Sequence, residues 1–458
     1  MNTTTDSLRW ATEHFSGVRL YNKTKVKRLI SMAFRMAEGK MTSLARLFDN
    51  WYDTKATYTL LKNQYMTPDI IQETHRQLVY AEMENWQHDV LAIEDSSEFE
   101  WNGKAPIQGL GPIGSGREKD QGFILHTTLA VGTFEENDSV KVFGTVFQQF
   151  YVRPPVRKKK KKRSDTTETI ETDLWRTVIS EKAIPPKKNV IRICDRNADI
   201  YEVMQETKEY GCRHVIRLKH DRIVLSENIA IKELMNIKES QGDFEITKRF
   251  KGEQKEQTLK LSVNWEKVDL RAPSRPGIGI GKLTPLQETI VHVWGYDDKG
   301  ELIEWFLYTD LEVNSIEDAI KIAKYYAKRW IIEDFHKMLK TGLKAEDLQL
   351  EQAHSIFATI AIMSVVASRL VGLRENLRIN PDAPASESGL SELEIKVLGK
   401  YLKREIKTVK CVVLAIGRLG GHQNRKGDGM PGVLSLWRGL SRFLSIMEGV
   451  LMMVNKNY

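Results

Sequence analysis

The order of strand and helix patterns between residues 88 and 220 is the feature that most constrains the fold. Five apolar runs with β character occur there: residues 88–95, 122–132, 140–154, 189–195 and 214–220. The first three follow one another directly, whereas a helical pattern at 198–211 separates the last two. Two neighbouring strands joined through a helix lie parallel, and strands joined by short turns lie antiparallel. The sequence therefore predicts an α/β fold, with a mixed sheet covered by helices.

The segments that follow predict a second group of strands and then helices. Residues 222–312 contain four more strand-like runs, so we expect a β insertion between the last core strand and the next helix. That helix is expected to begin at Ser315, where Ser315 and Asp318 form a capping-box pattern, and to end at Gly342. Residues 345–458 are mostly helical in pattern. We expect three domains, at 1–70, 71–370 and 371–458.

The first 70 residues predict a small basic helical domain. Helices are expected around Leu8–Phe15, Lys25–Glu38 and Ser43–Leu61. Residues 1–65 hold 11 Lys and Arg against five Asp and Glu, in a chain with a net charge of +8. The second helix is amphipathic, which leaves Arg28 and nearby lysines for solvent or phosphate. Such an excess favours a polyanionic partner, although charge alone does not distinguish a nucleic acid from an acidic membrane.

Other features exclude several classes of protein. The run from Arg153 to Arg163 holds eight basic residues and no acid, and predicts a low-complexity loop. The three cysteines are widely spaced, which argues against a disulfide scaffold or a zinc site. The longest apolar run, Ile356 to Ser368, is too short to span a bilayer and predicts a buried helix. With no apolar signal region at the N-terminus, we expect a cytoplasmic protein without a membrane partner.

The helix expected at 315–342 carries four functional side chains: Tyr326, Arg329, Glu333 and Lys340, spaced Y-x2-R-x3-E-x6-K. At about 100° per residue these offsets place all four within roughly 60° of the first, on one helix face. A carboxylate flanked by cations suits holding a divalent metal beside phosphates. Mixed charges at helical spacing are equally typical of a solvated face. These four residues alone leave both interpretations open.

Two further carboxylates follow predicted core strands, Asp95 after VLAIE and Asp195 after VIRIC. Strand ends bring together side chains that are distant in sequence. Two Mg²⁺ ions about 4 Å apart, bridged by carboxylates, can drive phosphodiester transfer. An Asp after a strand is also typical of a cap or turn, but together with Glu333 the metal interpretation is favoured. His126 and His336 are not expected to be metal ligands. This constellation points to DNA phosphoryl chemistry.

The same residues carry a family resemblance. LAIED around Asp95, CDRNADIY around Asp195 and the complete Y-x2-R-x3-E-x6-K signature resemble the DDE transposases of bacterial insertion sequences. The likeness is to the insertion-sequence-four family, which includes the Tn-five-type enzymes. It implies an RNase H-like catalytic core interrupted by the β insertion, an N-terminal helical domain that binds DNA ends and a C-terminal helical dimerisation domain. It also implies cut-and-paste transposition through a hairpin on the transposon end.

The resemblance also implies roles for individual residues. Asp95, Asp195 and Glu333 would be catalytic and would bind two Mg²⁺ ions, for which Mn²⁺ would substitute. Trp305 would stack on a base flipped out during hairpin formation, unless it is simply a buried strand residue. Contacts to double-stranded DNA, either transposon ends or target, are expected from these residues: Tyr326, Arg329, Lys340, Trp305, Arg217, Lys219, Arg28, Lys62, His336 and Lys337. His336 is alternatively a second-shell neighbour of the metal site.

Some positions depart from the family pattern, and other functions stay open. Thr59 and Lys62 stand where relatives often carry arginines, so readout of the end sequence by the third helix is in doubt. A non-enzymatic, domesticated DNA-binding protein and an RNase H-like nuclease without strand transfer are the alternatives.

The helix from about Val433 carries an apolar face. We expect it to form a homodimer contact in the synaptic complex, the alternative being packing on its own chain.

Overall fold

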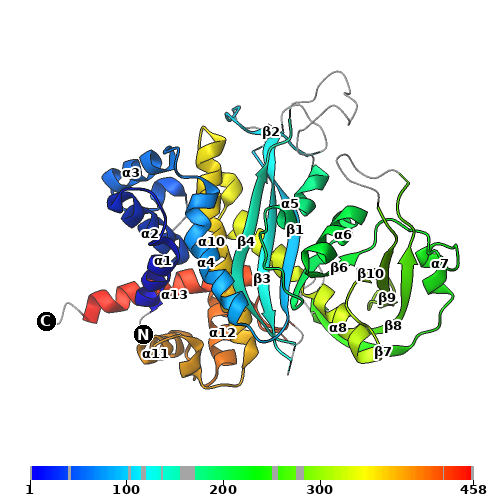
Figure 1. Ribbon diagram of the computed structural model, residues 1–458. Coiled ribbons are helices and arrows are strands. Elements are labelled where there is room, and N and C mark those ends of the chain that lie inside the picture. Colours follow the sequence, from blue (N-terminus) through cyan, green and yellow to red (C-terminus); the bar gives the residue numbers. More distant parts are fainter. Residues whose placement is uncertain are drawn as a thin grey trace.

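The structure is a computed structural model that describes residues 3–39, 43–101, 105–114, 120–135, 138–154, 171–249, 256–274, 283–425 and 428–454. Helices from both ends of the chain pack beside the first strands of a large sheet, and the β insertion forms the opposite end of that sheet (Figure 1). Most of the basic run from Arg153 to Arg163 falls outside the described residues. The low-complexity loop expected there therefore stays a prediction.

Four helices begin the chain: α1 (Thr3–Phe15), α2 (Lys23–Ala37), α3 (Trp51–Leu61) and α4 (Pro68–Asn85). The side chain of Asn22 caps α2 by accepting hydrogen bonds from the backbone of Thr24 and Lys25. The expected third helix from Ser43 is wrong in its first turns, because only a short 3-10 turn at Leu44–Arg46 forms there. Asn50 caps the N–H of Asp53 instead, and this cap sets the start of α3.

The central sheet has the predicted mixed topology. Its core strands are β1 (Val90–Glu100), β3 (Gln121–Thr133), β4 (Val140–Tyr151), β5 (Val190–Cys194) and β6 (Arg213–Arg217). β1, β3 and β4 pair antiparallel, whereas β5 is parallel to β1 and β6 is parallel to β5. Helix α6 (Tyr201–Tyr210) connects β5 to β6, as a parallel pair requires. A two-residue strand, β2 (Gly111–Pro112), pairs with the start of β3.

The insertion extends this same sheet. It contains α7 (Ile231–Asn236), β7 (Gly242–Arg249), β8 (Glu256–Leu270), β9 (Leu286–Tyr296) and β10 (Leu302–Thr309). β10 pairs antiparallel with β6, and β9, β8 and β7 follow in order. The last strand of the insertion therefore lies directly beside the last strand of the core (Figure 1).

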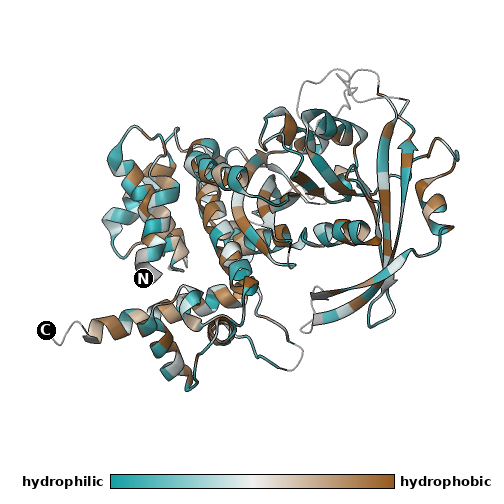
Figure 2. Ribbon diagram, turned by 60° about the horizontal axis from the view of Figure 1, so that its bottom comes forward, coloured by the Kyte–Doolittle hydropathy of each residue, from teal (hydrophilic) through white to brown (hydrophobic). Residues whose placement is uncertain are grey.

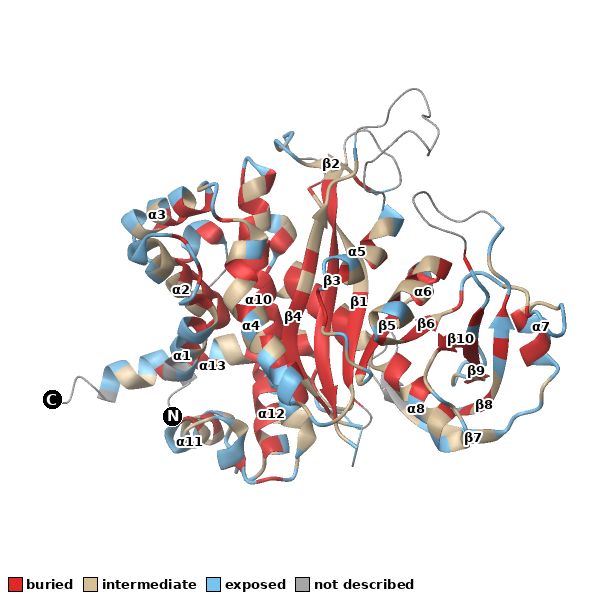
Figure 3. Ribbon diagram, in the orientation of Figure 1, coloured by how far each residue is buried: buried red, intermediate tan, exposed pale blue. Residues whose placement is uncertain are grey.

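Side-chain alternation along β1 divides the protein core into two layers. Leu91 and Ile93 belong to the large cluster that also includes residues of α1 and α2 and buried residues between 319 and 371. Val90 and Ala92 point to the other face and pack with residues of α4 and α5 (Leu174–Ser180). The strands between these layers are buried along most of their length (Figure 3). Each β1 residue is thus assigned to one face by its position.

The helix expected at 315–342 is interrupted. It consists of α8 (Ile316–Ala327), α9 (Trp330–Lys337) and a π turn (Met338–Gly342). The capping box of Ser315 and Asp318 is confirmed. The prediction of one uninterrupted helix is wrong. The backbone N–H groups of Ile331 and Ile332 bond to carbonyls three residues back, and that of Leu343 bonds to the carbonyl five residues back. Tertiary packing, rather than one helical period, therefore positions the four signature residues.

The longest helix, α10 (Ala353–Ile379), is the predicted buried helix. By length and composition alone it is long and apolar enough to cross a membrane. However, 83% of its most apolar window is buried inside the protein. It packs on β4, α4 and α9, and its buried residues occur on all sides of the helix between Ala353 and Glu375. Hydrophobic residues are frequent in the helices and strands at the centre of the molecule (Figure 2). A helix that is apolar on all sides is one that its own protein surrounds.

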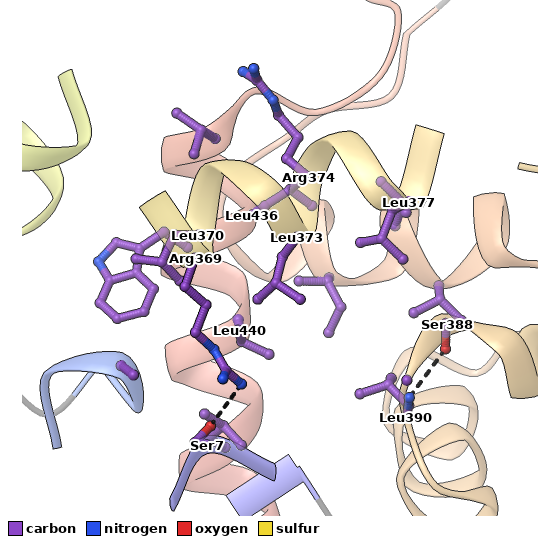
Figure 4. Close-up of a pocket in the computed structure, with 18 of the residues that line it drawn as sticks. Ser7, Arg369, Leu370, Leu373, Arg374, Leu377, Ser388, Leu390, Leu436 and Leu440 are labelled. Carbon is purple, nitrogen blue, oxygen red and sulfur yellow. Dashed lines mark hydrogen bonds between the residues drawn. The ribbon is translucent and has the colours of Figure 1, made fainter. Parts of the chain in front are cut away.

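The C-terminal helices α11 (Glu392–Leu402), α12 (Val409–Leu419) and α13 (Val433–Val454) pack near the end of α10. On α13, Trp437, Phe443 and Met447 are buried against the same chain. An apolar cavity of about 130 Å³ separates α10, α12 and α13, and Arg369 and Ser7 form a hydrogen bond at its edge (Figure 4). Much of the apolar face predicted for a dimer contact is therefore used within the chain.

Candidate active site

Asp95 and Asp195 lie side by side where the parallel pairing of β1 with β5 ends. Asp195 directly follows β5, but the expectation that Asp95 ends its strand is wrong, because β1 continues to Glu100 through its pairing with β3. In the pairing of β1 with β5, Glu94 is opposite Cys194, so the next residue of each strand is an aspartate. Asp95 accepts a hydrogen bond from the Ser96 N–H at 2.9 Å. Asp195 begins a 3-10 turn and accepts from the backbone N–H of Asn197 at 2.8 Å. Parallel pairing thus brings together two residues that are a hundred positions apart.

The neighbouring acid, Glu94, points to the opposite face of the sheet. Its carboxylate accepts two hydrogen bonds from Arg192, at 2.6 and 2.7 Å, and both side chains are fully buried. Arg192 also donates to the Thr207 hydroxyl and the Trp175 carbonyl. Cys194 belongs to the apolar cluster on this face, as strand alternation predicts. Glu94 is therefore committed to an internal ion pair.

Glu333 reaches the same neighbourhood through an arginine. Arg329 forms a hydrogen-bonded ion pair with Glu333, and its Nη1 lies 3.6 Å from Oδ2 of Asp95. The side chains of Arg329 and Asp95 are 15% and 18% exposed, and that of Glu333 is 35% exposed. One guanidinium thus serves two carboxylates at a partly open site.

The electrostatics of this site call for positive charge. Burial raises the pKa of Asp95 to about 7; Arg329 opposes that rise, while the nearby charges of Asp195 and Glu333 add to it. Burial acts against the charged form of Arg329, but Tyr326, Asp95 and Glu333 hold its pKa above the ordinary value. The repulsion that Asp95 experiences from two neighbouring acids is one that a bound cation would relieve.

The residue types fit Mg²⁺, whereas their arrangement is that of an ion pair. Carboxylate oxygens are the ligands that Mg²⁺ prefers. In the part of the chain that the structure describes, however, no three His, Cys, Asp or Glu side chains are grouped to hold a metal ion. Arg329 lies between Asp95 and Glu333 instead. Metal binding by these residues would require Arg329 to move from the carboxylates.

Tyr326 and Trp305 pack against each other beside the acids. Their rings meet edge to face with centroids 5.4 Å apart, and the residues are 5% and 7% exposed. Burial raises the pKa of Tyr326, and the hydrogen bond between its side chain and Arg217 opposes that rise. Arg217 also donates to the Glu304 carbonyl at 3.1 Å. Trp305 is thus a buried strand residue in this structure, and its stacking on a flipped base stays a prediction.

The remaining predicted contacts of α9 and the π turn differ in exposure. Lys340 donates to the Glu98 carbonyl and lies 3.4 Å from a carboxylate oxygen of Glu346. His336 is buried, with Nδ1 at 3.9 Å from Asp95, and its pKa is lowered to about 3 by burial and then by Lys340 and Arg329. Lys337 is exposed. This placement favours the second-shell interpretation of His336, while Lys337 has the accessibility that a DNA contact needs.

The other predicted DNA contacts lie on separate parts of the protein. Lys219 is exposed in the segment after β6. Arg28 of α2 forms an ion pair with Asp53, and Lys62, after α3, lies 3.8 Å from Glu351. The structure therefore brings Arg217 to the acids, but it leaves Arg28 and Lys62 in the N-terminal helices.

Sequence reasoning did not identify one acid close to this site. Asp199, four residues after Asp195, is 1% exposed and accepts hydrogen bonds from the backbone N–H groups of Lys219 and His220. Its signal in the sequence was weak, because an Asp after a strand is also common in turns. The only hint was its place in CDRNADIY, beside the predicted catalytic aspartate.

Two family models match the chain. Residues 156–368 match the family described as Transposase DDE domain, and residues 7–66 match the family described as Transposase DNA-binding. The first match includes Asp195 and Glu333, and the second spans most of α1 and all of α2 and α3. The mixed sheet is consistent with an RNase H-like DDE domain. The chain therefore carries a transposase DDE domain and a transposase DNA-binding domain, which together support a DNA transposase.

Proposed function

We propose that this protein is a cut-and-paste transposase of the insertion-sequence-four type. It would bind transposon ends, nick and hairpin them, and join them to target DNA. Asp95, Asp195 and Glu333 are proposed as its catalytic residues. The observation that supports this proposal is the register of β1 with β5, which makes Asp95 and Asp195 neighbours, with Glu333 sharing the guanidinium of Arg329 with Asp95. The two family matches support the same reading.

Asp95, Asp195 and Glu333 would hold the divalent cations. When bound, two Mg²⁺ ions supply an activated nucleophile and stabilise the leaving oxygen in phosphodiester transfer, and Mn²⁺ would substitute for them. The chain itself supplies the negative charge that recruits these ions. The Asp95 carboxylate is mostly buried and therefore poorly solvated, which strengthens its interaction with a cation.

Arg329 and Tyr326 would hold DNA phosphate next to the acids. A phosphate that takes over the guanidinium of Arg329 frees Asp95 and Glu333 for the metal ions, because one fork-shaped group cannot pair with all three. Lys340 would exchange Glu346 for a phosphate in the same way. DNA binding and metal binding would then favour each other.

Trp305 is proposed to stabilise the hairpin by stacking on a flipped base. Its indole is now covered by Tyr326, so the role requires the two rings to separate when DNA enters. Stacking of a base on an aromatic side chain contributes about 1–3 kcal/mol, enough to offset the lost contact between the rings. Trp305→Ala should therefore leave the first nick intact and slow hairpin formation.

The two alternatives make different predictions for the products. A nuclease without strand transfer would cut DNA and never join it to a target, and a non-enzymatic DNA-binding protein would do neither. All three acids are present in the sequence, which argues against the second alternative. No contact in the described residues favours the first alternative over transposition.

Incubation with Mg²⁺ and with the DNA that flanks the coding sequence tests the proposal. Denaturing gels should resolve nicked, hairpin and strand-transfer products, and Glu333→Gln should abolish all of them while end binding persists. Nicks without hairpins or joined products would favour the nuclease. Products from Glu333→Gln at the wild-type rate would refute the assignment of the acids.

Homodimerisation in a synaptic complex is proposed as part of this function, in the cytoplasm of a bacterium. Concerted insertion of one DNA segment needs two ends cut together, so each protomer could bind one end and cut the other. Because much of the face of α13 is buried within the chain, the contact would use other surfaces or a rearranged α13. Sizing with and without end DNA tests it. A one-to-one complex competent for strand transfer would refute the dimer.

A further inference from the structure

Asp199 is a buried carboxylate that the proposed chemistry does not use. It directly follows the 3-10 turn Arg196–Ala198, and its side chain is 0% exposed. Burying a carboxylate costs several kcal/mol unless hydrogen bonds and an opposite charge compensate it. A chain that keeps such a group four residues from Asp195 needs a compensating set of partners there.

In the part of the chain that the structure describes, the hydrogen bonds to the Asp199 carboxylate come from one segment, residues 219–222. Its Oδ2 accepts hydrogen bonds from two consecutive backbone N–H groups, that of Lys219 at 2.6 Å and that of His220 at 2.7 Å. Its Oδ1 pairs with the guanidinium of Arg222. Two successive N–H groups turned toward one oxygen form a backbone anion site. Asp199 fills that site with a group from the turn after Asp195.

A second layer of contacts makes this arrangement rigid. Arg222 donates to the hydroxyl of Tyr308 at 2.9 Å, and that hydroxyl donates to the His220 carbonyl at 3.0 Å. The guanidinium carbon also lies 5.4 Å and 5.9 Å from the ring centroids of Tyr308 and Tyr201. The segment from His220 to Arg222 therefore has almost no freedom to shift relative to Asp199.

The segment held in this way follows β6, and together they carry Arg217 and Lys219 to the edge of the site. In the pairing of β5 with β6, Cys194 is opposite Ile216, so Asp195 lies beside Arg217. The Arg217 side chain bonds to Tyr326, and the Lys219 side chain projects into solvent. We call these contacts between Asp199 and residues 219–222 the Asp199 staple. The staple joins the turn that follows Asp195 to the segment that carries Lys219.

We infer that Asp199 is a positioning residue, which holds Lys219 at a fixed place beside Asp195 so that it grips the phosphate next to the cleaved bond. This inference rests on the proposed function, since it assigns Lys219 to the DNA of the same site. Asp199 itself touches neither DNA nor metal in this scheme. Its effect passes through the backbone of Lys219 and His220.

The test measures DNA affinity with Ca²⁺ in place of Mg²⁺, by fluorescence anisotropy across a range of salt concentrations. Asp199→Asn keeps the volume of the side chain and an oxygen for the N–H groups, but it cannot neutralise Arg222. We expect at least tenfold weaker binding. We also expect a slope of log K against log salt that is smaller by about 0.9, as for one lost phosphate contact.

Asp310 provides a matched control. It follows strand β10, its side chain is 2% exposed, and it accepts from the His214 N–H at 2.9 Å and from Arg213 at 3.1 Å. It therefore makes the same kind of staple at the other end of β6. Asp310→Asn should lower the melting temperature as Asp199→Asn does, but leave the salt slope unchanged. Equal binding and equal slopes for the two variants, at equal stability, would overturn the inference.

Coupling to Lys219 provides a readout that a purely structural role would not move. Lys219→Ala should weaken DNA binding and reduce the salt slope in the wild-type background, and should change neither in the Asp199→Asn background. The same effect of Lys219→Ala in both backgrounds overturns the inference. If Asp199→Asn does not fold, Tyr308→Phe removes one bridge of the staple. It should then reduce the effect of Lys219→Ala, and an undiminished effect would count against the staple.

These outcomes are separable from the proposed function. Binding is measured without cleavage, so the coupling can be present even if Glu333→Gln cuts DNA normally, which would refute only the catalytic assignment. Conversely, if Glu333→Gln abolishes cleavage and the coupling is absent, only the role of Asp199 fails. A wild-type protein that binds no DNA would overturn both.

Discussion

Glu94 and Asp95 are consecutive acids on one strand, and each is paired with an arginine, yet the two pairs lie in different environments. Glu94 and Arg192 are both 0% exposed and are joined by two short hydrogen bonds. Asp95 lies 3.6 Å from Arg329, which is shared with the partly exposed Glu333. The first pair is fully compensated. The second leaves a carboxylate with a pKa of about 7 at an accessible face.

This difference shows how one strand places two consecutive acids in different environments, one sealed and one partly open. Alternation sends adjacent side chains to opposite faces, so a shift of one residue exchanges a sealed environment for an open one. The sealed pair is expected to matter for folding and the open pair for chemistry. Substitutions that treat the two pairs alike can test this division directly.

The largest expected effect is on catalysis. If the proposed function is correct, Asp95→Asn should reduce DNA cleavage by roughly 10³-fold or more, because the variant would lose a charge that bridges the metal ions. It should leave end binding and the fold intact. Cleavage assays in Mg²⁺ together with urea unfolding measure both properties. Cleavage within tenfold of wild type would mean that Asp95 is not a catalytic residue and that the two acids do not differ in function.

The next effect is on stability. Glu94→Gln leaves Arg192 charged and buried without a counter-ion, which should lower the free energy of unfolding by about 3–5 kcal/mol. The folded fraction of this variant should still cleave DNA at close to the wild-type rate. Urea unfolding, with cleavage normalised to the folded protein, tests both statements. A stable but inactive variant would instead place Glu94 in the chemistry.

The pH dependence of stability should differ between Asp95 and its Asn variant. The pKa of Asp95 is raised to about 7 in the folded protein, while in the unfolded chain it is about 3.9. The folded state therefore holds the proton more tightly, and stability is lost as the pH rises from about 4 through 7. The total is roughly 2–4 kcal/mol. In EDTA, the free energy of unfolding of wild type should fall by this amount between pH 4 and 8, relative to that of Asp95→Asn. Urea unfolding across this pH range measures the difference, and parallel pH curves for the two proteins would contradict the prediction.

The strand order and the two aspartates could be predicted from the sequence because both depend on local pattern. Apolar runs and turn residues define the core strands, and the acids directly follow those runs. The capping box at Ser315 is equally local. Strand alternation is also local, and it accounts for the opposite faces of Glu94 and Asp95.

Other features depend on contacts that no local pattern encodes. The helix is interrupted between α8 and α9, at Lys328 and Arg329, where Arg329 pairs with Glu333 and Asp95. The helical period alone predicted one uninterrupted helix. The packing of α13 on its own chain depends on α10 and α12, which lie elsewhere in the sequence. The staple of Asp199 joins segments twenty residues apart. In each case a long-range contact outweighs local propensity.

The smallest expected effect comes from exchanging each arginine for lysine. Arg192 donates to Glu94 twice, to Thr207 and to the Trp175 carbonyl, and one ammonium cannot reproduce that fork. Arg192→Lys should therefore cost about 2 kcal/mol of stability and leave cleavage by the folded protein unchanged.

Arg329→Lys keeps a charge at a partly open site, so its stability should change by less than about 1 kcal/mol. Its cleavage should fall about tenfold, because bidentate contact with phosphate is lost. Urea unfolding and single-turnover cleavage of both variants, side by side, check the pattern; equal stability losses with equal cleavage losses would mean that the two pairs are not functionally distinct.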